Sequence, residues 1–562
     1  MTPFSAEARA EHWNALAGET WDLLVIGGGV TGAGIARDAA GRDLRVALVD
    51  AGDIAHGTSS RSSRLVHGGL RYLETYDFRL VFEASAERRR LLALAPHLVH
   101  PLPFLFPVFR KGPVGRRKLQ AGMWLYDTLS LFRNISRHRM LSRRQVAAEE
   151  PMLRMDNVVG AAMYYDASVD DARLALANAR GAHEAGAAVV PHAEVVGFIR
   201  DEDATRGVRV RDALTGRTAE VAARVVINAT GPWSDEVRRL ADPEAAPRLR
   251  PTKGVHIMVE RERLGNHNAI TFRSPVDGRV MFVLPWGDFS YVGTTDTDYH
   301  GAPADVHADA EDVRYLLDSA NSLFPRARLT DTDVVSTWAG LRPLLAPPQA
   351  GSDLSASATS REHEIWQDAT GLLNIAGGKL TTYRVMAHEA TDVAADILRE
   401  RDGVESGDSL TRDLPLPGAP VEPWAEFLPR IRARAGEMGL GEEVGEHLAR
   451  FYGDDAPTIL DAVAADPELG TRLVPSLPYI RAEVAHGVRC DMATTLEDLL
   501  VRRLHLFYEA RDGGLAVARE VAERMAAEPG IGWNEAEIDE QVRRYRRAVA
   551  GTRGFGSAAA AA

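Results

Sequence analysis

One short stretch near the start of the chain limits what it can fold into. Residues 21–50, WDLLVIGGGVTGAGIARDAAGRDLRVALVD, read as a strand, a glycine turn, a helix and a second strand. Residues 23–26 are a continuous apolar run, which is typical of a strand buried on both faces. Gly27, Gly29 and Gly32 form G-x-G-x-x-G, in which the glycines allow a tight turn, close approach of a pyrophosphate and close helix–strand packing. The stretch therefore predicts a dinucleotide-binding unit.

The residues that follow the glycines complete this site. The helix expected over 31–40 would point its first N–H groups at the phosphates. Asp50 ends the second strand, where a carboxylate can accept hydrogen bonds from a ribose. Strand, helix, second strand and acid all fall in register, so the pattern favours a dinucleotide site over a glycine-rich turn of no further function.

Two later segments repeat the change from a buried strand to a glycine turn. They are residues 223–235, ARVVINATGPWSD, and residues 371–384, GLLNIAGGKLTTYR. We therefore expect an α/β plus α+β protein, with a Rossmann-like domain built from the discontinuous ranges 20–95, 155–250 and 335–402. Residues 96–154 and 251–334 would form an antiparallel-sheet substrate or cap domain, in which residues 279–296 predict a β-hairpin.

The remainder of the chain has a different composition. Residues 403–424 are rich in proline and predict a linker, and residues 425–552 read as a helical domain. Residues 553–562 are of low complexity, and we expect them to form a disordered tail.

Bulk composition excludes several functions. The formal net charge of −13 argues against a nucleic-acid partner, because phosphate binding needs a basic face. The single cysteine, Cys490, excludes internal disulfides and cysteine-based metal sites and favours a reducing cytoplasm, and we expect no metal. The N-terminus does not resemble a signal peptide, and no apolar run is long enough to span a bilayer.

Eight segments resemble a known family when they are taken together. In order between residues 22 and 384 they are DLLVIGGGVTGAGIARDAAGR, GTSSRSSRLVHGGLRYLE, VDDARLALANAR, NATGPWSD, KGVHI, FVLPWGDFSYVGTTDTDY, WAGLRPLL and GGKLTTYR. This set resembles the FAD-dependent glycerol-3-phosphate dehydrogenases, flavoenzymes similar in fold to D-amino-acid oxidase. EVAHGVRCDMATTLEDLLVRR resembles the helical extension of the same family. Two departures are Asp50, where glutamate is commoner, and Cys490 in the C-terminal motif.

The resemblance implies a cofactor, a reaction and the residues that carry it. The cofactor would be non-covalent FAD, and the reaction would be oxidation of sn-glycerol 3-phosphate to dihydroxyacetone phosphate by hydride transfer from C2 to the flavin. Such a substrate needs arginines that bind phosphate bidentately and a base for the hydroxyl proton. We expect the catalytic residues to be His67, Arg71, Arg342 and Lys379, and the substrate-binding residues to be Arg71, Tyr72, Arg342, Arg361, Lys379 and Thr381.

His67 is the first choice for the base, because imidazole has a proton affinity near working pH. The alternative, that His67 only bonds the flavin or orients Arg71, stays open. The turn 377–379 precedes a helix whose N-terminus would stabilise negative charge on the reduced flavin. We expect the cofactor to contact Gly27, Gly29, Gly32, Asp50, Thr58, Ser59, Ser60, Ser63, Gly68, Gly69, Gly231, Gly377, Gly378 and Thr381.

A basic region points to the electron acceptor. Residues 110–144 contain one acidic residue, Asp127, and ten basic residues: Arg110, Lys111, Arg116, Arg117, Lys118, Arg133, Arg137, Arg139, Arg143 and Arg144. Apolar residues at helical spacing occur in the same region, a combination that can bind an anionic membrane surface. The alternative is an ordinary helix with solvated arginines. We expect a cytoplasmic enzyme, peripheral on the inner face of the cell membrane, that reduces membrane quinone.

Two other functions remain open. One is an oxidase that passes the electrons to oxygen, although related oxidases carry a central insertion that is not evident here. The other is a non-catalytic flavin-binding protein. The C-terminal helices could also mediate a homodimer.

Overall fold

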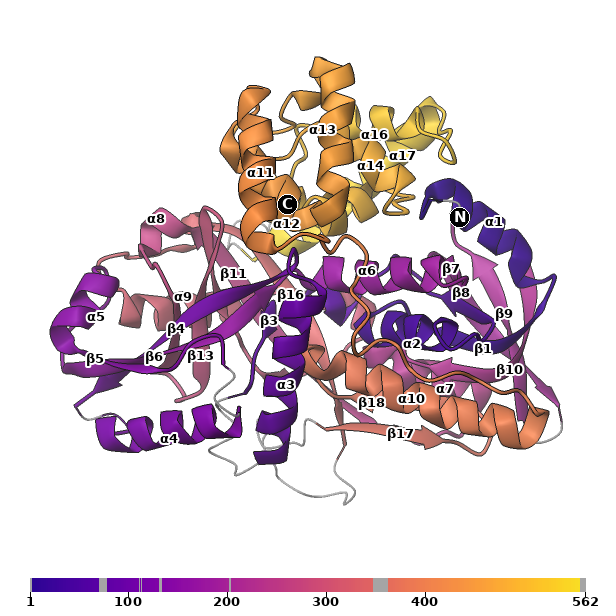
Figure 1. The fold of residues 1–562 in the computed structure, drawn as a ribbon, viewed down its shortest axis with the longest axis horizontal. Helices are drawn as coiled ribbons and strands as arrows, with labels where there is room; N and C mark the ends of the chain where they lie inside the picture. The colour runs from indigo at the N-terminus through magenta and orange to yellow at the C-terminus, as the bar shows by residue number, and fades with distance from the viewer. Residues whose placement is uncertain are drawn as a thin grey trace.

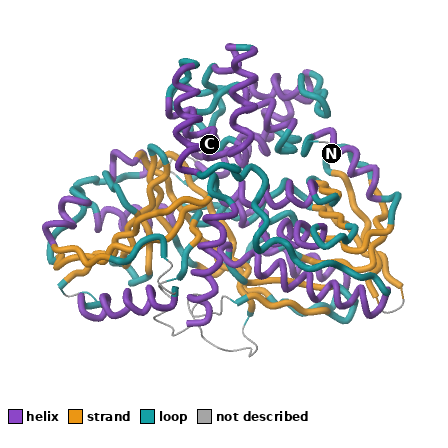
Figure 2. Tube along the Cα trace, viewed as in Figure 1, coloured by secondary structure: helices purple, strands orange, loops and turns teal. Residues whose placement is uncertain are grey.

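Two β-sheets and a separate group of helices organise the chain, and Figures 1 and 2 show the helical group seated above both sheets. The computed structural model describes residues 3–69, 78–110, 112, 114–130, 134–201, 204–346 and 362–555. This arrangement confirms the predicted fold class: a Rossmann-like domain, an antiparallel substrate sheet and a C-terminal helical domain.

The first sheet contains the dinucleotide unit. Its strand order is β17-β18-β10-β1-β2-β7, with β9 pairing β10 and β8 pairing β9. Strands β18, β10, β1, β2 and β7 are parallel, so their carboxyl ends meet at one edge. The bounds are β1 (Thr20–Ile26), β2 (Val46–Val49), β7 (Ala188–Val190), β8 (Ala193–Asp201), β9 (Ala204–Asp212), β10 (Thr218–Asn228), β17 (His363–Gln367) and β18 (Leu373–Gly377).

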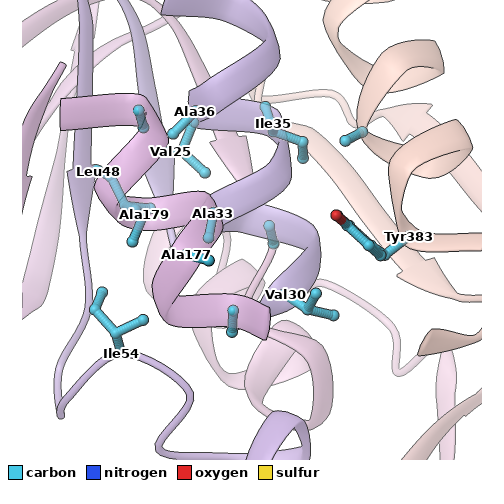
Figure 3. Close-up of a cluster of buried hydrophobic side chains, with 14 of the residues drawn as sticks. Val25, Val30, Ala33, Ile35, Ala36, Leu48, Ile54, Ala177, Ala179 and Tyr383 are labelled. Atoms are coloured by element: carbon cyan, nitrogen blue, oxygen red, sulfur yellow. The ribbon is translucent and has the colours of Figure 1, made fainter. Parts of the chain in front are cut away.

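Three helices that come from distant parts of the sequence pack together beside this sheet. Helix α2 (Val30–Ala40) contacts both α6 (Asp171–Glu184) and α10 (Tyr383–Ile397). Figure 3 shows alanines of α2 and α6 side by side, with Tyr383 of α10 approaching α2. Small residues permit the close approach of α2 and α10, since a Cβ atom added at Gly34 would lie only 3.1 Å from Ala387 Cβ. The packing joins the three predicted segments of the nucleotide-binding domain.

The second sheet is mostly antiparallel. Its order is β15-β11-β14-β13-β12-β4-β6-β3, with β16 on β11 and β5 on β6. The predicted hairpin is confirmed as the antiparallel pair of β13 and β14. The bounds are β3 (Leu65–Val66), β4 (Val99–Phe109), β5 (Arg139–Ser142), β6 (Val158–Val169), β11 (Leu249–Glu260), β12 (Ala269–Arg273), β13 (Val280–Trp286), β14 (Phe289–Gly293), β15 (Thr297–Asp298) and β16 (Val334–Leu345).

Three strands of this sheet correct the predicted division of the chain. Residues 20–95, 155–250 and 335–402 were assigned to the nucleotide-binding domain, yet β3 pairs with β6, β6 pairs along its length with β4, and β16 pairs with β11. These ladders of hydrogen bonds place all three strands in the substrate sheet. The chain therefore returns to the nucleotide-binding domain only after β6 and after β16. Both points lie further along the sequence than the predicted bounds at residues 155 and 335.

The remaining helices of these two parts lie around the sheets. Helix α1 contacts β7 and β10, α3 contacts α4, and α9 contacts β11. Their bounds are α1 (Ala6–Leu16), α3 (Phe78–Leu94), α4 (Arg116–Leu129), α5 (Arg143–Glu149), α7 (Ser234–Ala241), α8 (Arg261–Leu264) and α9 (Ala310–Leu323).

The predicted linker lies against the nucleotide-binding domain. Arg37 of α2 donates to the carbonyls of Leu414 and Pro415, at 2.8 and 3.0 Å. Beyond it stand α11 (Trp424–Glu437), α12 (Glu442–Tyr452), α13 (Ala456–Ala465), α14 (Ala482–Arg489), α15 (Leu506–Glu509), α16 (Ala518–Ala526) and α17 (Glu535–Arg553), with a π-helical turn at Asp498–Arg503.

The first residue of the predicted tail is part of a helix. Arg553, assigned to the tail, is the last residue of α17, and its guanidinium donates to the Ala510 carbonyl at 2.9 Å and the Val335 carbonyl at 3.2 Å. These contacts with two parts of the fold order the end of the helix. The prediction for residues 556–562 lies outside the described residues.

Candidate active site

A cavity of about 1700 Å³ runs from the glycine turn of the first sheet to the face of the second. Residues of both sheets and of the C-terminal helices line it. Its volume exceeds the ~300–1,000 Å³ that is usual for a single small ligand. The space can therefore hold an extended cofactor together with a small substrate.

One end of the cavity has the geometry of a dinucleotide cradle. Gly27 has φ +110°, and a Cβ atom on it would lie 2.7 Å from the Ala229 carbonyl oxygen. At Gly32 a Cβ atom would lie 1.9 Å from the Gly27 carbonyl oxygen, so this glycine serves helix–strand packing and does not line the cavity. Gly29 does line it. Gly27 and Gly29 thus line the cavity as expected, whereas the predicted contact of Gly32 with the cofactor is not supported.

Asp50 stands where a ribose acid is expected. It lines the cavity, and its carboxylate accepts from the N–H of Gly28 at 2.5 Å and of Gly52 at 2.8 Å. Burial raises the pKa of Asp50, which the two hydrogen bonds offset in part. The carboxylate is thus fixed in place by backbone on either side.

The hydroxyl-rich segment divides between two environments. Thr58, Ser59 and Ser63 line the cavity, and Ser59 Oγ accepts from the N–H of Val30, the first residue of α2, at 2.9 Å. Ser60 is buried outside the cavity lining, so its predicted cofactor contact is not supported. Gly231 lines the cavity, and a Cβ atom there would meet nothing within 4 Å.

The part of the cavity where the flavin and the substrate are predicted to meet, called the reaction end, begins at the turn after β18. Gly377 and Gly378 have φ +82° and +78°, and together with Lys379 and Thr381 they line the cavity. Thr381 Oγ1 accepts from the N–H of His67 at 3.2 Å. This bond brings the predicted base next to the predicted flavin turn.

Two glycines after His67 do not line the cavity. A Cβ atom at Gly68 would lie 2.2 Å from the Tyr126 hydroxyl, and the N–H of Gly68 donates to Asp166 at 2.9 Å. Gly69 has φ +72°, a conformation that favours glycine. Both therefore shape the loop, and their predicted contacts with the cofactor are not supported.

Arg342, on β16, is fixed at the cavity wall. Its guanidinium bonds Asp296 Oδ1 at 2.9 Å, the Thr295 carbonyl at 3.1 Å and Thr294 Oγ1 at 3.2 Å. Arg273 and Arg279 also line the cavity. The predicted residues Arg71, Tyr72 and Arg361 lie outside the described residues.

Comparison with known proteins identifies the family. Residues 22–384 match the family model described as FAD dependent oxidoreductase, and residues 409–538 match the C-terminal domain of alpha-glycerophosphate oxidase. The chain is 41% identical over 542 residues to glycerol-3-phosphate dehydrogenase 2 of Mycobacterium tuberculosis, covering 96% of this chain and 90% of that protein. The chain belongs to the FAD-dependent glycerol-3-phosphate dehydrogenase family.

Two further relatives agree. The aerobic glycerol-3-phosphate dehydrogenase of Staphylococcus haemolyticus is 37% identical over 518 residues, covering 90% of this chain and 91% of that protein. The solved structure of the Bacillus halodurans glycerol-3-phosphate dehydrogenase, complexed with FAD, has a TM-score of 0.81 at 31% identity and covers 98% of this chain and 99% of that one. FAD is thus the cofactor of this family member, and the glycine cradle and Asp50 fit it.

From the sequence we did not predict that one buried histidine, His256, would lie near the site. His256 of β11 is buried, its Nε2 lies 2.9 Å from Ser63 Oγ, and its ring stacks on Trp338 at 5.0 Å. Burial, and then the charges of Arg342 and Arg64, lower the pKa of His256 to about 3. A neutral imidazole therefore lies beside the predicted substrate arginine. The segment KGVHI was the available signal, but it carried no local pattern of its own.

Proposed function

We propose that this chain oxidises sn-glycerol 3-phosphate to dihydroxyacetone phosphate and delivers the electrons to membrane quinone. One observation carries the first half: a single cavity joins the nucleotide cradle to a wall that holds His67, Arg342 and Lys379. The relatives' names support the same substrate. When bound, FAD accepts the hydride from C2.

The side chains at the reaction end divide the remaining tasks. Arg342, fixed by Asp296, offers guanidinium N–H groups to the substrate's phosphate or oxygen atoms. Lys379 stands at the start of the helical segment that follows the glycine turn, where positive charge stabilises a reduced, anionic flavin. His67 lines the cavity and remains the proposed acceptor of the hydroxyl proton. His256 does not line it, and its lowered pKa makes its imidazole a weak base.

Replacing His67 with asparagine is expected to slow flavin reduction by ~10²–10⁴-fold, the usual contribution of a general base. Substrate affinity should change far less, because asparagine keeps a polar group of similar size. Anaerobic stopped-flow absorbance measures both quantities from the substrate dependence of bleaching. His388→Asn, on the outer part of α10, serves as the control.

Flavin reduction by His67→Asn at the wild-type rate would remove His67 from the role of base.

The proposal that quinone is the electron acceptor depends on helix α4. This helix lines the cavity and also exposes apolar side chains to solvent. Its residues Lys118, Leu119, Gly122 and Leu125 line the flavin cavity. Trp124 and Leu125 are also 49% and 39% exposed. An apolar quinone approaching from a membrane at this helix would therefore be close to the cavity.

Reoxidation kinetics test the acceptor directly. Substrate-reduced enzyme is mixed with a short-chain quinone or with air-saturated buffer, and the return of flavin absorbance is followed. We expect the quinone to reoxidise the flavin much faster than oxygen does. Faster reoxidation by oxygen would favour the oxidase, the second function left open by the sequence.

A membrane contact at α3 and α4 accounts for the exposed aromatic residues there. The two helices pack together, Phe78 and Phe82 of α3 are 40% and 48% exposed, and Arg116, Arg117 and Lys118 begin α4. Figure 1 shows α4 at the edge opposite the C-terminal domain and α3 running from the middle of the molecule toward that edge. Among the described residues, no helix is long and apolar enough to cross a bilayer. We propose a peripheral site on the inner face of the membrane.

Replacing Trp124 and Leu125 together with glutamate is expected to weaken binding to anionic vesicles by at least ~10-fold, since two apolar side chains leave the interface and two like charges enter. Co-sedimentation at low salt measures this. Leu410→Glu, at an exposed position of the linker, is the matched control and should bind as wild type. Wild-type protein that ignores anionic vesicles would remove the membrane contact.

A further inference from the structure

The C-terminal helical domain reaches the nucleotide end of the cavity. It contributes Thr495, Glu497, Asp498, Arg502 and Arg544 to the wall, next to Asp53, His56 and His192 of the nucleotide-binding domain. Arg502 contacts Asp53 and Asp498 contacts His192, close to the loop that follows Asp50, the predicted ribose acid. A domain that is separate in sequence thus completes the site of the cofactor.

The loop after Asp50 connects the ribose acid to this domain. Within residues 51–56, the N–H of Gly52 donates to the Asp50 carboxylate and the Gly52 carbonyl accepts from the N–H of His192 at 2.7 Å. The N–H of Ala193 donates to the Asp50 carbonyl at 2.6 Å. The position of Asp50 therefore depends on how this loop is held.

Buried ion pairs hold the loop against the C-terminal domain. Asp53 accepts from Arg502 Nε and, at 2.9 Å, from Arg503 Nη2. Asp498 accepts from Arg502 Nη2 at 3.0 Å and lies 3.0 Å from His192 Nε2. All five side chains are buried. A buried carboxylate that loses its partner is destabilised strongly, so the loop and the domain are coupled.

Local backbone geometry brings the two arginines to the same carboxylate. They end the π-helical turn Asp498–Arg503, whose first residue, Asp498, also accepts from the N–H of Thr494 and Thr495 at 3.0 and 2.9 Å. π-Helical turns are rare and frequently occur at functional sites. Asp53, His192 and Asp498 have ligand atoms within 4.8 Å of one another, but the arginines already supply the positive charge that a metal ion would bring.

We propose that the C-terminal helical domain retains the cofactor, with Asp498 and Arg502 as positioning residues for the loop 51–56. In this arrangement the π-helical turn fixes Asp53, Asp53 fixes the loop, and the loop fixes the Asp50 carboxylate at the ribose of FAD. The inference rests on FAD binding and is independent of the substrate and of the electron acceptor.

FAD titration of the apoprotein tests this. Arg502→Gln is expected to raise the dissociation constant for FAD by at least ~10-fold. Amide hydrogen exchange of residues 51–56 should be faster than in the wild type. Asp498→Asn, which is nearly isosteric, should have the same two effects and decides the matter if Arg502→Gln does not fold.

The matched control breaks another buried ion pair between the same two domains. Arg173 of α6 bonds Asp491 at 3.0 Å, away from the flavin cavity. Arg173→Gln should lower the melting temperature but leave FAD affinity and exchange of the loop near wild type. Wild-type FAD affinity in whichever of Arg502→Gln and Asp498→Asn folds would overturn the proposal. Equal loss of FAD in Arg173→Gln would also overturn it, since domain docking alone would then explain the effect.

Discussion

Replacing Gly32 with alanine is expected to weaken FAD binding by ~5–150-fold. The new Cβ atom would lie 1.9 Å from the carbonyl oxygen of Gly27 and 3.1 Å from its carbonyl carbon. Both neighbours are backbone atoms of the cradle, so the helix must move away from the turn that binds the pyrophosphate. Overpacking of this kind costs ~1–3 kcal/mol or more. Flavin absorbance per chain and the melting temperature of the purified variant measure the outcome.

Gly551→Ala is the control for this substitution. Gly551 lies in α17, and a Cβ atom there would meet nothing within 4 Å. Its replacement should leave flavin content unchanged and stabilise the helix by ~0.5–1 kcal/mol. A Gly32→Ala protein that keeps its full flavin content would show that the cradle does not form as described.

Replacing Arg342 with glutamine is expected to lower kcat/KM for glycerol 3-phosphate by at least ~100-fold, because charge-assisted hydrogen bonds to a phosphate or developing oxyanion are lost. Arg342→Lys should recover little activity, since an ammonium lacks the planar pair of donors. The flavin spectrum should remain that of the wild type. Steady-state kinetics with a dye acceptor, together with flavin titration, separate the two readouts.

Arg250 offers a matched control on the neighbouring strand β11. It bonds Asp298 at 2.8 Å, as Arg342 bonds Asp296, but it does not line the cavity. Arg250→Gln should leave kcat/KM within ~2-fold, the effect of an exposed ion pair. Equal activity of the Arg342 and Arg250 variants would remove Arg342 from the substrate site.

The dinucleotide unit and the predicted hairpin could be found from the sequence because each depends on local patterns. Glycines at fixed spacing predict the turn at Gly27, and two apolar, aromatic-rich runs on either side of residues 285–288 predict the hairpin. The ranges that contain β3, β6 and β16 were assigned to the nucleotide-binding domain, although these strands belong to the substrate sheet. Their residues are apolar and buried in either location, so only the pairing with β4 and β11 decides.

Site residues could be predicted only where they belong to a recognisable sequence motif. Arg342 and Lys379 stand in such motifs, and both line the cavity. His256 was missed because its neighbours Trp338 and Ser63 come from distant parts of the chain. The contact between Asp53 and Arg502 joins residues 449 positions apart, which no local pattern reveals.

The most direct measurement is anaerobic. The visible flavin spectrum of the purified protein is recorded, glycerol 3-phosphate is added, and the spectrum is followed. We expect rapid bleaching of the oxidised flavin, which would establish the substrate and the reductive half-reaction together. A flavin that binds but stays oxidised would contradict the proposed reaction while leaving the fold and the cofactor unchanged.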